Sequence, residues 1–225
     1  MIFRRRPKPD EMPQAEDGQE VAAEPSVRSE GPWDRSETDA DVEDTTYVDL
    51  GGLIVKTAPG LELRLQVDEP NGLVAAVLLA GPESGLELRA FAAPRTQGIW
   101  DEVRADIAEE AARRGGTATE LEGAFGREIK VMVPAQTPDG RQATQTSRIV
   151  GVDGPRWMLR GTFLGKSSAQ AGIDEVLEQA FRDVIVVRGD APMSPRALIA
   201  MQVPEHARSA WEESRHDPAT PATEQ

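Results

Sequence analysis

The sequence predicts an α+β fold, in which an antiparallel meander sheet is covered by two amphipathic helices and flanked by disordered N- and C-terminal tails. Strand-like segments follow one another across short turns, and two segments with helical periodicity interrupt them. Helices with a single apolar stripe need a sheet face to cover. Strands and helices do not alternate regularly, so a parallel nucleotide-binding sheet is not expected.

The first meander is expected in the first half of the domain. Residues 61–67 alternate strictly between apolar and polar, which is typical of a half-buried strand. Residues 73–80 are apolar on both faces, as in a central strand, and residues 86–92 continue the sheet. The segments 68–72 and 81–85 contain the proline and glycine residues of tight turns, so the strands pair with their neighbours in the sequence.

The first helix is predicted directly after this meander. Apolar residues recur at helical spacing from Ile99 to Ala111. The acidic pair 101–102 falls in the first turn, the basic pair 113–114 in the last turn, and the glycine pair 115–116 ends the helix. This order of charges suits the helix dipole.

A similar pattern predicts a second meander followed by a second helix. Strands are expected at residues 118–121, 128–133, 141–152 and 156–164, with a hairpin turn at 137–140. The apolar stripe of the second helix consists of Ile173, Val176, Leu177, Ala180, Phe181 and Val184.

Two later segments each allow two structures. Residues 184–187 either extend the second helix or form a final strand. Residues 194–203 form either a helix with Ser194 as N-cap and Pro195 in its first turn, or an extended segment bounded by two prolines. The sequence does not separate these alternatives.

Composition divides the chain into a disordered acidic tail (residues 1–46), a single α+β domain (47–203) and a disordered polar tail (204–225). Residues 10–46 contain 13 acidic residues and two basic ones, in a chain of net charge −14. Such a segment buries too little apolar area to offset the entropy lost on ordering. The role of the acidic tail and the oligomeric state are left open.

The predicted domain lacks the residue types that most often carry catalysis. The chain contains no cysteine, and its two histidines, His206 and His216, lie in the C-terminal tail. Thiol nucleophiles, imidazole acid–bases and the usual zinc ligands are therefore missing from the folded part. Catalytic, cofactor-binding and metal-binding residues are not predicted, no cofactor is expected, and the question of enzymatic activity is left open with a non-enzymatic role preferred.

The sharpest local motif is a strand-to-helix junction at residues 161–167. A phosphate loop needs four residues between its two glycines, whereas this segment has three. One interpretation is a simple turn in which Ser167 or Ser168 caps the second helix. The other is an anion-binding site formed by Lys166, Ser167 and Arg160.

Basic and acidic residues alternate along the predicted polar face of the sheet. The basic members are Arg64, Arg89, Lys130, Arg148 and Arg160, interleaved with Glu62, Glu87 and Glu128. They form either a surface for an anionic ligand or a ladder of cross-strand ion pairs, each worth about a few tenths of a kcal/mol. In a third interpretation the acidic tail folds back over this face.

Charge and hydropathy also set expectations for location and partners. The net charge of −14 gives no strong nucleic-acid signal, because phosphate binding needs a basic footprint. The longest apolar run, residues 73–80, is far shorter than the about 20 residues that span a bilayer, and no signal peptide is visible, so a cytoplasmic location is expected. One basic cluster either contacts an anionic membrane surface or RNA, or solubilises the terminus: Arg4, Arg5, Arg6 and Lys8.

Four motifs carry a resemblance to a known family: residues 47–53 (YVDLGGL), 98–104 (GIWDEVR), 156–161 (RWMLRG) and 184–189 (VIVVRG). They resemble an uncharacterised actinobacterial family, one of the domain-of-unknown-function groups. The likeness covers about residues 45–203. The resemblance implies the domain boundaries and a bacterial cytosolic protein, but no activity, cofactor or catalytic residue.

These observations predict a non-enzymatic binding or adaptor module that acts through its tails or its polar sheet face. Trp33 and Trp211 stand alone in polar tails, which is either incidental or typical of short segments that bind a protein partner. The alternative function is an enzyme or sensor that binds an anionic or phosphorylated ligand through arginine and lysine side chains.

Overall fold

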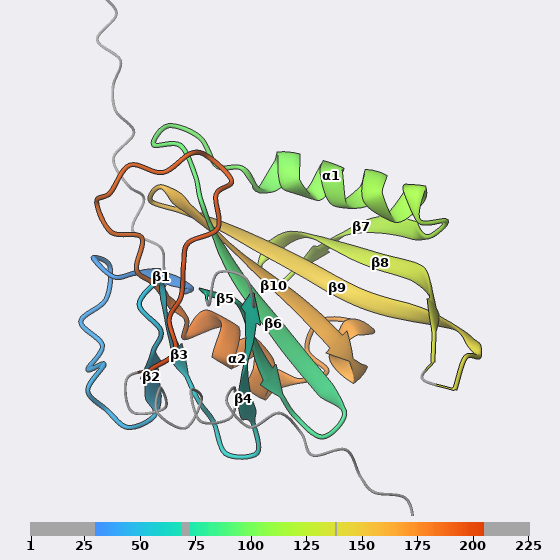
Figure 1. Ribbon diagram of the computed structural model, residues 1–225, viewed down its shortest axis with the longest axis horizontal. Helices are drawn as coiled ribbons and strands as arrows, with labels where there is room; N and C mark the ends of the chain where they lie inside the picture. The colour runs from blue at the N-terminus through green and yellow to red at the C-terminus, as the bar shows by residue number, and fades with distance from the viewer. Residues whose placement is uncertain (1–29, 69–72, 138, 205–225) are drawn as a thin grey trace, which may run out of the picture.

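The computed structural model describes residues 30–68, 73–137 and 139–204, which form two β-sheets and two α-helices (Figure 1). The strands before the first helix are β1 (Trp33–Asp34), β2 (Tyr47–Asp49), β3 (Leu53–Lys56), β4 (Glu62–Asp68), β5 (Leu73–Ala80) and β6 (Ser84–Ala92). They are followed by α1 (Trp100–Arg113), β7 (Thr117–Gly123), β8 (Gly126–Gln136), β9 (Gln142–Gly154), β10 (Trp157–Gly165), the 3-10 helix η1 (Lys166–Ser168), α2 (Glu175–Arg182) and β11 (Ile185–Val186).

The two predicted meanders join into one seven-stranded antiparallel sheet with the order β4-β5-β6-β10-β9-β8-β7. The junction is the pairing of β6 with β10, which runs from Ala92 opposite Trp157 to Ser84 opposite Gly165. A smaller sheet has the order β1-β11-β3-β2. The predicted α+β class is confirmed, and the small sheet is an addition that the sequence did not predict.

Helix α1 covers one face of the large sheet, as its apolar stripe predicted. Trp100 lies against Gly151 of β9, where a Cβ would come within 2.2 Å of the indole, so this close approach requires glycine. The carboxylate of Asp153 accepts hydrogen bonds from the backbone N–H groups of Ile99 at 2.8 Å and Trp100 at 3.2 Å. A residue of the sheet thus caps the helix, because the side chain of Ile99 at the N-cap position cannot.

Helix α2 and the small sheet cover the opposite face. The residues of β10 alternate: Trp157, Leu159 and Phe163 belong to the core on the α2 side, whereas Met158 belongs to the core under α1. This period of two is the expected consequence of strand geometry and fixes which side chains reach which helix.

The second helix is shorter than predicted. Asp174 caps it, accepting a hydrogen bond from Leu177 N–H at 3.2 Å, so the helix begins after Ile173, which is exposed. The prediction that Ser167 or Ser168 caps this helix is wrong: both residues lie in η1, and their hydroxyls donate to backbone carbonyls within the turn.

The predicted domain boundary at residue 47 needs correction, because residues 30–46 are part of the folded unit. Strand β1 pairs in parallel with β11, with Trp33 N–H donating to Val184 O at 2.9 Å. Asp34 accepts a hydrogen bond from the indole Nε1 of Trp157 at 2.7 Å. An acidic segment is ordered here because backbone pairing and one buried indole hold it, and composition does not reveal either contact.

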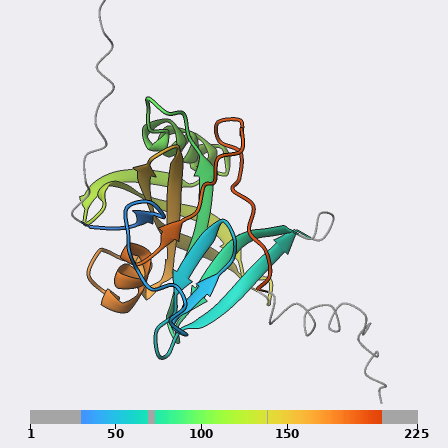
Figure 2. The same ribbon diagram turned by 90° about the vertical axis from the view of Figure 1, so that its left-hand side faces the viewer.

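Neither of the two segments with alternative predictions is helical. Residues Ile185–Val186 form β11 of the small sheet and do not prolong α2. The segment 194–203 runs from α1 across β6 to β5 (red in Figures 1 and 2), with bridges between Leu198 and Phe91 and between Met201 and Val74.

The predictions for the outermost residues are not addressed by the structure. The basic cluster at residues 4–8, the remaining acidic tail and the C-terminal tail with Trp211 and both histidines lie outside the described residues. Within the described ranges, none of the helices is long and apolar enough to cross a membrane.

Candidate functional site

A buried arginine ties two strands to α2. Arg148 of β9 donates to Glu128 of β8 at 3.0 Å and to Glu178 of α2 at 2.8 Å, and its guanidinium lies 4.1 Å from the ring centre of Phe163. The three charged side chains are only 1%, 2% and 6% exposed, respectively. The N–H donors of Arg148 are directed at protein acceptors, which include Ser167 O at 3.3 Å. This network is therefore structural and is closed to a ligand.

The predicted polar face is therefore not one continuous surface. Arg148 and Glu128 are buried under α2, whereas Arg89 pairs with Glu87 at 2.8 Å on a part-exposed surface. Arg64 pairs with Glu62 on the exposed β4 in the same way. Lys130 donates to Ala169 O at 2.8 Å. Arg64 and Arg89 thus form ion pairs with neighbouring glutamates, and the five basic side chains do not converge on one shared site.

The three residues of the predicted anion site are not brought together. Lys166 forms an ion pair with Glu83 at the β5–β6 turn, and the hydroxyl of Ser167 donates to Leu164 O at 2.9 Å. Arg160 precedes them, in β10, and lies on the face of the large sheet that α1 covers, next to residues of α1, β8 and β9. Anion binding by this trio stays a prediction without support from their placement.

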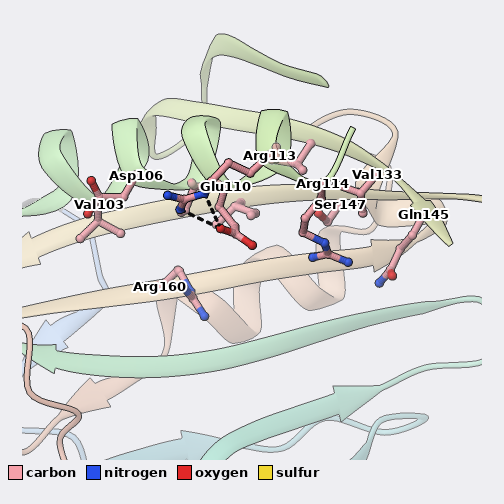
Figure 3. Close-up of a pocket in the computed structure, with 13 residues that line it drawn as sticks. Val103, Asp106, Glu110, Arg113, Arg114, Val133, Gln145, Ser147 and Arg160 are labelled. Carbon is pink, nitrogen blue, oxygen red and sulfur yellow. Dashed lines mark hydrogen bonds and ion pairs between the residues drawn. The ribbon is translucent and has the colours of Figure 1, made fainter. Parts of the chain in front are cut away.

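Arg160 lines a cavity of about 430 Å³ between α1 and strands β8, β9 and β10, which we call the α1 cavity (Figure 3). Its apolar lining consists of Val103, Ile107, Ala111, Val131, Val133 and Ile149. The inward face of α1 carries small or medium side chains toward its C-terminal end, with Ala111 following Ile107 by one turn. The helix therefore leaves space above β9 and β10 that side chains do not fill.

The guanidinium of Arg160 is incompletely satisfied. Its side chain is 23% exposed; among the described residues its nearest carboxylate is Glu87 at 3.9 Å, and its buried Nε has no hydrogen-bond partner. Burial, followed by the positive charge of Arg89, lowers the pKa of Arg160, and Glu87 offsets this only in part. A guanidinium stays protonated at neutral pH, so the unsatisfied donor and charge persist in the free protein.

The mouth of the cavity adds a second cation and two neutral polar groups. Arg114, at the C-cap of α1, is exposed and extends toward β9, and no described carboxylate lies close enough to pair with it (Figure 3). By contrast, Arg113 pairs with Glu110 at 2.7 Å, and Asp106 is paired with Arg196 at 2.7 Å. The remaining polar groups are Gln145 and Ser147 of β9. Excess charge at this mouth is thus positive, in a chain of net charge −14.

Sequence reasoning named Arg160 but associated it with the wrong neighbours, and it explained Arg114 by the helix dipole alone. It missed Gln145 and Ser147. The available signal was the two-residue alternation that puts Gln145, Ser147 and Ile149 of β9 on one face. That signal shows a shared face but does not show that a helix leaves the face partly open.

In residues 30–68, 73–137 and 139–204, no group of three or more His, Cys, Asp or Glu side chains is placed to hold a metal ion. A search of curated proteins found no match to the chain. A family model described as "Protein of unknown function (DUF3710)" matches residues 31–210, which includes the ordered segment before residue 47. Since the match covers most of the 225 residues, the chain belongs to the DUF3710 family.

Proposed function

We propose that the protein is a non-enzymatic binding module, and that its α1 cavity holds a small molecule with an apolar body and a carboxylate. The observation that carries this proposal is Arg160, a cation at an apolar cavity whose nearest carboxylate among the described residues is 3.9 Å away. A ligand carboxylate supplies the missing negative charge and accepts from the terminal N–H groups of the guanidinium. Arginine favours this partner because its planar fork matches two carboxylate oxygens.

Size and lining support a ligand of this kind. A volume of about 430 Å³ lies in the range of small-molecule sites, about 300–1,000 Å³. The apolar floor suits an aliphatic body, and Arg114 adds attraction at the mouth. The paired carboxylates Asp106 and Glu110 disfavour a second negative charge on the ligand, so a monoanion fits better than a dianion.

Binding without catalysis is favoured by the lining residues. Their only hydroxyl belongs to Ser147, and the lining offers no imidazole or thiol to activate it. Both lining carboxylates, Asp106 and Glu110, are engaged by arginines and are thus poorly placed as general bases. Adaptor activity through the tails remains a separate proposal, tested by affinity purification with and without the acidic segment.

The test is isothermal titration calorimetry of the full chain with octanoate and, as the matched neutral ligand, octanol. We expect Arg160→Gln to weaken octanoate binding about tenfold or more, the loss of one charge-assisted interaction, and to leave octanol unchanged. Ile107→Trp, which fills the cavity, should abolish both. Arg113→Gln is the matched control, because Arg113 lies at the same mouth but is already paired. Equal octanoate affinity in wild type and Arg160→Gln contradicts the proposal.

A further inference from the structure

A second cavity, of about 440 Å³, lies where the end of β1, the β9–β10 turn and the segment after β11 meet. We call it the arginine pocket. It shares no lining residue with the α1 cavity. Five of its nine lining residues are charged: Asp34, Arg35, Arg156, Arg188 and Asp190. Three of the five are arginines, so the pocket carries more positive than negative charge.

Arginines elsewhere in the described residues are mostly paired. Nine of them have a carboxylate oxygen at 3.5 Å or less: Arg64, Arg89, Arg104, Arg113, Arg127, Arg141, Arg148, Arg182 and Arg196. Acidic residues outnumber basic ones by 39 to 25, so carboxylates are plentiful. Against this background, a cavity lined by three arginines without a close carboxylate is unexpected.

The three guanidiniums of the pocket find little compensation within the protein. The one hydrogen bond that the side chain of Arg35 donates to a described residue goes to the carbonyl of Thr38, at 3.2 Å. Arg188 donates to the carbonyl of Ala191 at 2.9 Å, and its buried Nε has no partner in the part of the chain that the structure describes. Arg156 has its nearest carboxylate at 4.0 Å, on the fully exposed Asp190. Donors from all three residues are thus left for another acceptor.

The other carboxylate of the pocket is already in use. Asp34 accepts hydrogen bonds from the backbone N–H of Ser36 at 2.9 Å, from its hydroxyl at 2.6 Å, and from the indole of Trp157 at 2.7 Å. Its negative charge is therefore directed toward the β1 turn and the core. This contact also fixes β1, and with it Arg35, against the large sheet.

Arg156 occupies a backbone conformation that its residue type disfavours. It is the second residue of the two-residue turn between β9 and β10, and its φ of +64° lies in the left-handed region. Glycine or asparagine adopts this region at lower cost, so an arginine here points to a use for its side chain. Arg156 is also close enough to Arg188 for its charge, after the larger effect of burial, to lower the pKa of that guanidinium.

We propose that the arginine pocket binds a small phosphate monoester, with Arg35, Arg156 and Arg188 as the groups that hold the phosphate. A phosphate monoester carries about −1.5 to −2 charges at neutral pH, so one group neutralises two neighbouring guanidiniums. The three phosphate oxygens can accept hydrogen bonds from several guanidinium groups at once, whereas the two oxygens of a carboxylate match a single guanidinium. The site differs from the α1 cavity both in place and in ligand charge.

The test is calorimetric titration of the full chain with inorganic phosphate and with glycerol 3-phosphate, with glycerol and acetate as the matched neutral and monoanionic probes. We expect both phosphates to bind, glycerol not to bind, and acetate to bind far more weakly. Arg188→Gln should weaken phosphate binding about tenfold and Arg35→Gln severalfold, since each removes a charge-assisted contact. Arg127→Gln, an exposed arginine paired with Glu122, is the control without an effect.

Arg156→Asn separates binding from folding. Asparagine tolerates the left-handed turn, so this variant should keep or raise the melting temperature while it weakens phosphate binding. The proposal is overturned if phosphate binding is the same in wild type, Arg35→Gln and Arg156→Asn, if acetate binds as well as phosphate, or if no phosphate probe binds at millimolar concentration. Arg160→Gln should leave phosphate binding unchanged, so the two ligand proposals stand or fall separately.

Discussion

The buried network around Arg148 makes a quantitative prediction about stability. Replacing Arg148 by methionine keeps most of the aliphatic stem but leaves Glu128 and Glu178 without their cation. These side chains are 2% and 6% exposed, so water cannot substitute for the guanidinium. Breaking a buried ion pair by removing one partner costs about 3–5 kcal/mol, which is a large part of a typical stability of about 5–15 kcal/mol.

The assay is urea unfolding followed by far-ultraviolet circular dichroism and by tryptophan fluorescence, to which the buried Trp100 and Trp157 contribute. For a domain of this size, the expected loss corresponds to a drop in melting temperature of about 6–20 °C. Arg64→Met is the control: both partners of the Arg64–Glu62 pair are more than half exposed, and we expect a change within about 0.5 kcal/mol. Adding Glu178→Gln to Arg148→Met should recover part of the loss, because one of the two unpaired charges is then removed.

The result that refutes this reasoning is an Arg148→Met protein within about 1 kcal/mol of wild type, the size of an ordinary substitution. Arg148→Lys tests geometry separately from charge. Lysine keeps the cation but lacks the fork that reaches both carboxylates, so it should fall between wild type and Arg148→Met. A lysine variant as stable as wild type would show that charge alone matters here.

Three further predictions concern the cap of α1, a surface pair and the α1 cavity. Asp153→Ala removes the acceptor for the first N–H groups of α1 and should cost about 1 kcal/mol, with hydrogen exchange accelerated in the first turn of that helix. The hydrogen bond from Arg64 lowers the pKa of Glu62 in the folded protein. The stability that this pair contributes is therefore complete above the unfolded pKa of Glu62, about 4.3, and is lost as pH falls through the lower folded pKa. Carboxyl-carbon NMR should show the lowered pKa of Glu62, and Arg64→Gln should return that pKa to its ordinary value. Arg160→Met should raise the stability of the ligand-free protein by about 1 kcal/mol while it abolishes octanoate binding, and a destabilised Arg160→Met protein would contradict this.

The parts of the fold that sequence predicts well are those set by local periodicity. The alternation in residues 61–67 and the apolar run 73–80 correspond to β4 and β5, and the stripe beginning at Ile99 corresponds to α1. Each of these patterns needs only its own residues and a face to bury. The pairing of β1 with β11 could not be found in this way, because it joins two two-residue strands about 150 positions apart in the sequence.

Burial of charge is likewise invisible to alternation. The polar positions of β9 and β10 look alike in sequence, and alternation alone assigns both Arg148 and Arg160 to one polar face. The structure places Arg148 toward α2, because it lies opposite Phe163 in the ladder, and Arg160 toward α1, because it lies opposite Gly151. Which face a strand residue reaches depends on register, and register is set by pairing between strands.

The contrast between these two arginines bears on where function resides. Both are largely removed from water, and burying an unpaired charge destabilises a fold. For Arg148 the chain supplies its own compensation, with two carboxylates at 3.0 and 2.8 Å. For Arg160 it supplies only one, at 3.9 Å, and leaves a buried donor unused. An arginine that serves the fold is compensated within the fold, whereas one retained for a ligand is compensated when the ligand binds. Substitutions at the two positions should therefore change stability in opposite directions, and the opposite signs distinguish a structural arginine from a binding one.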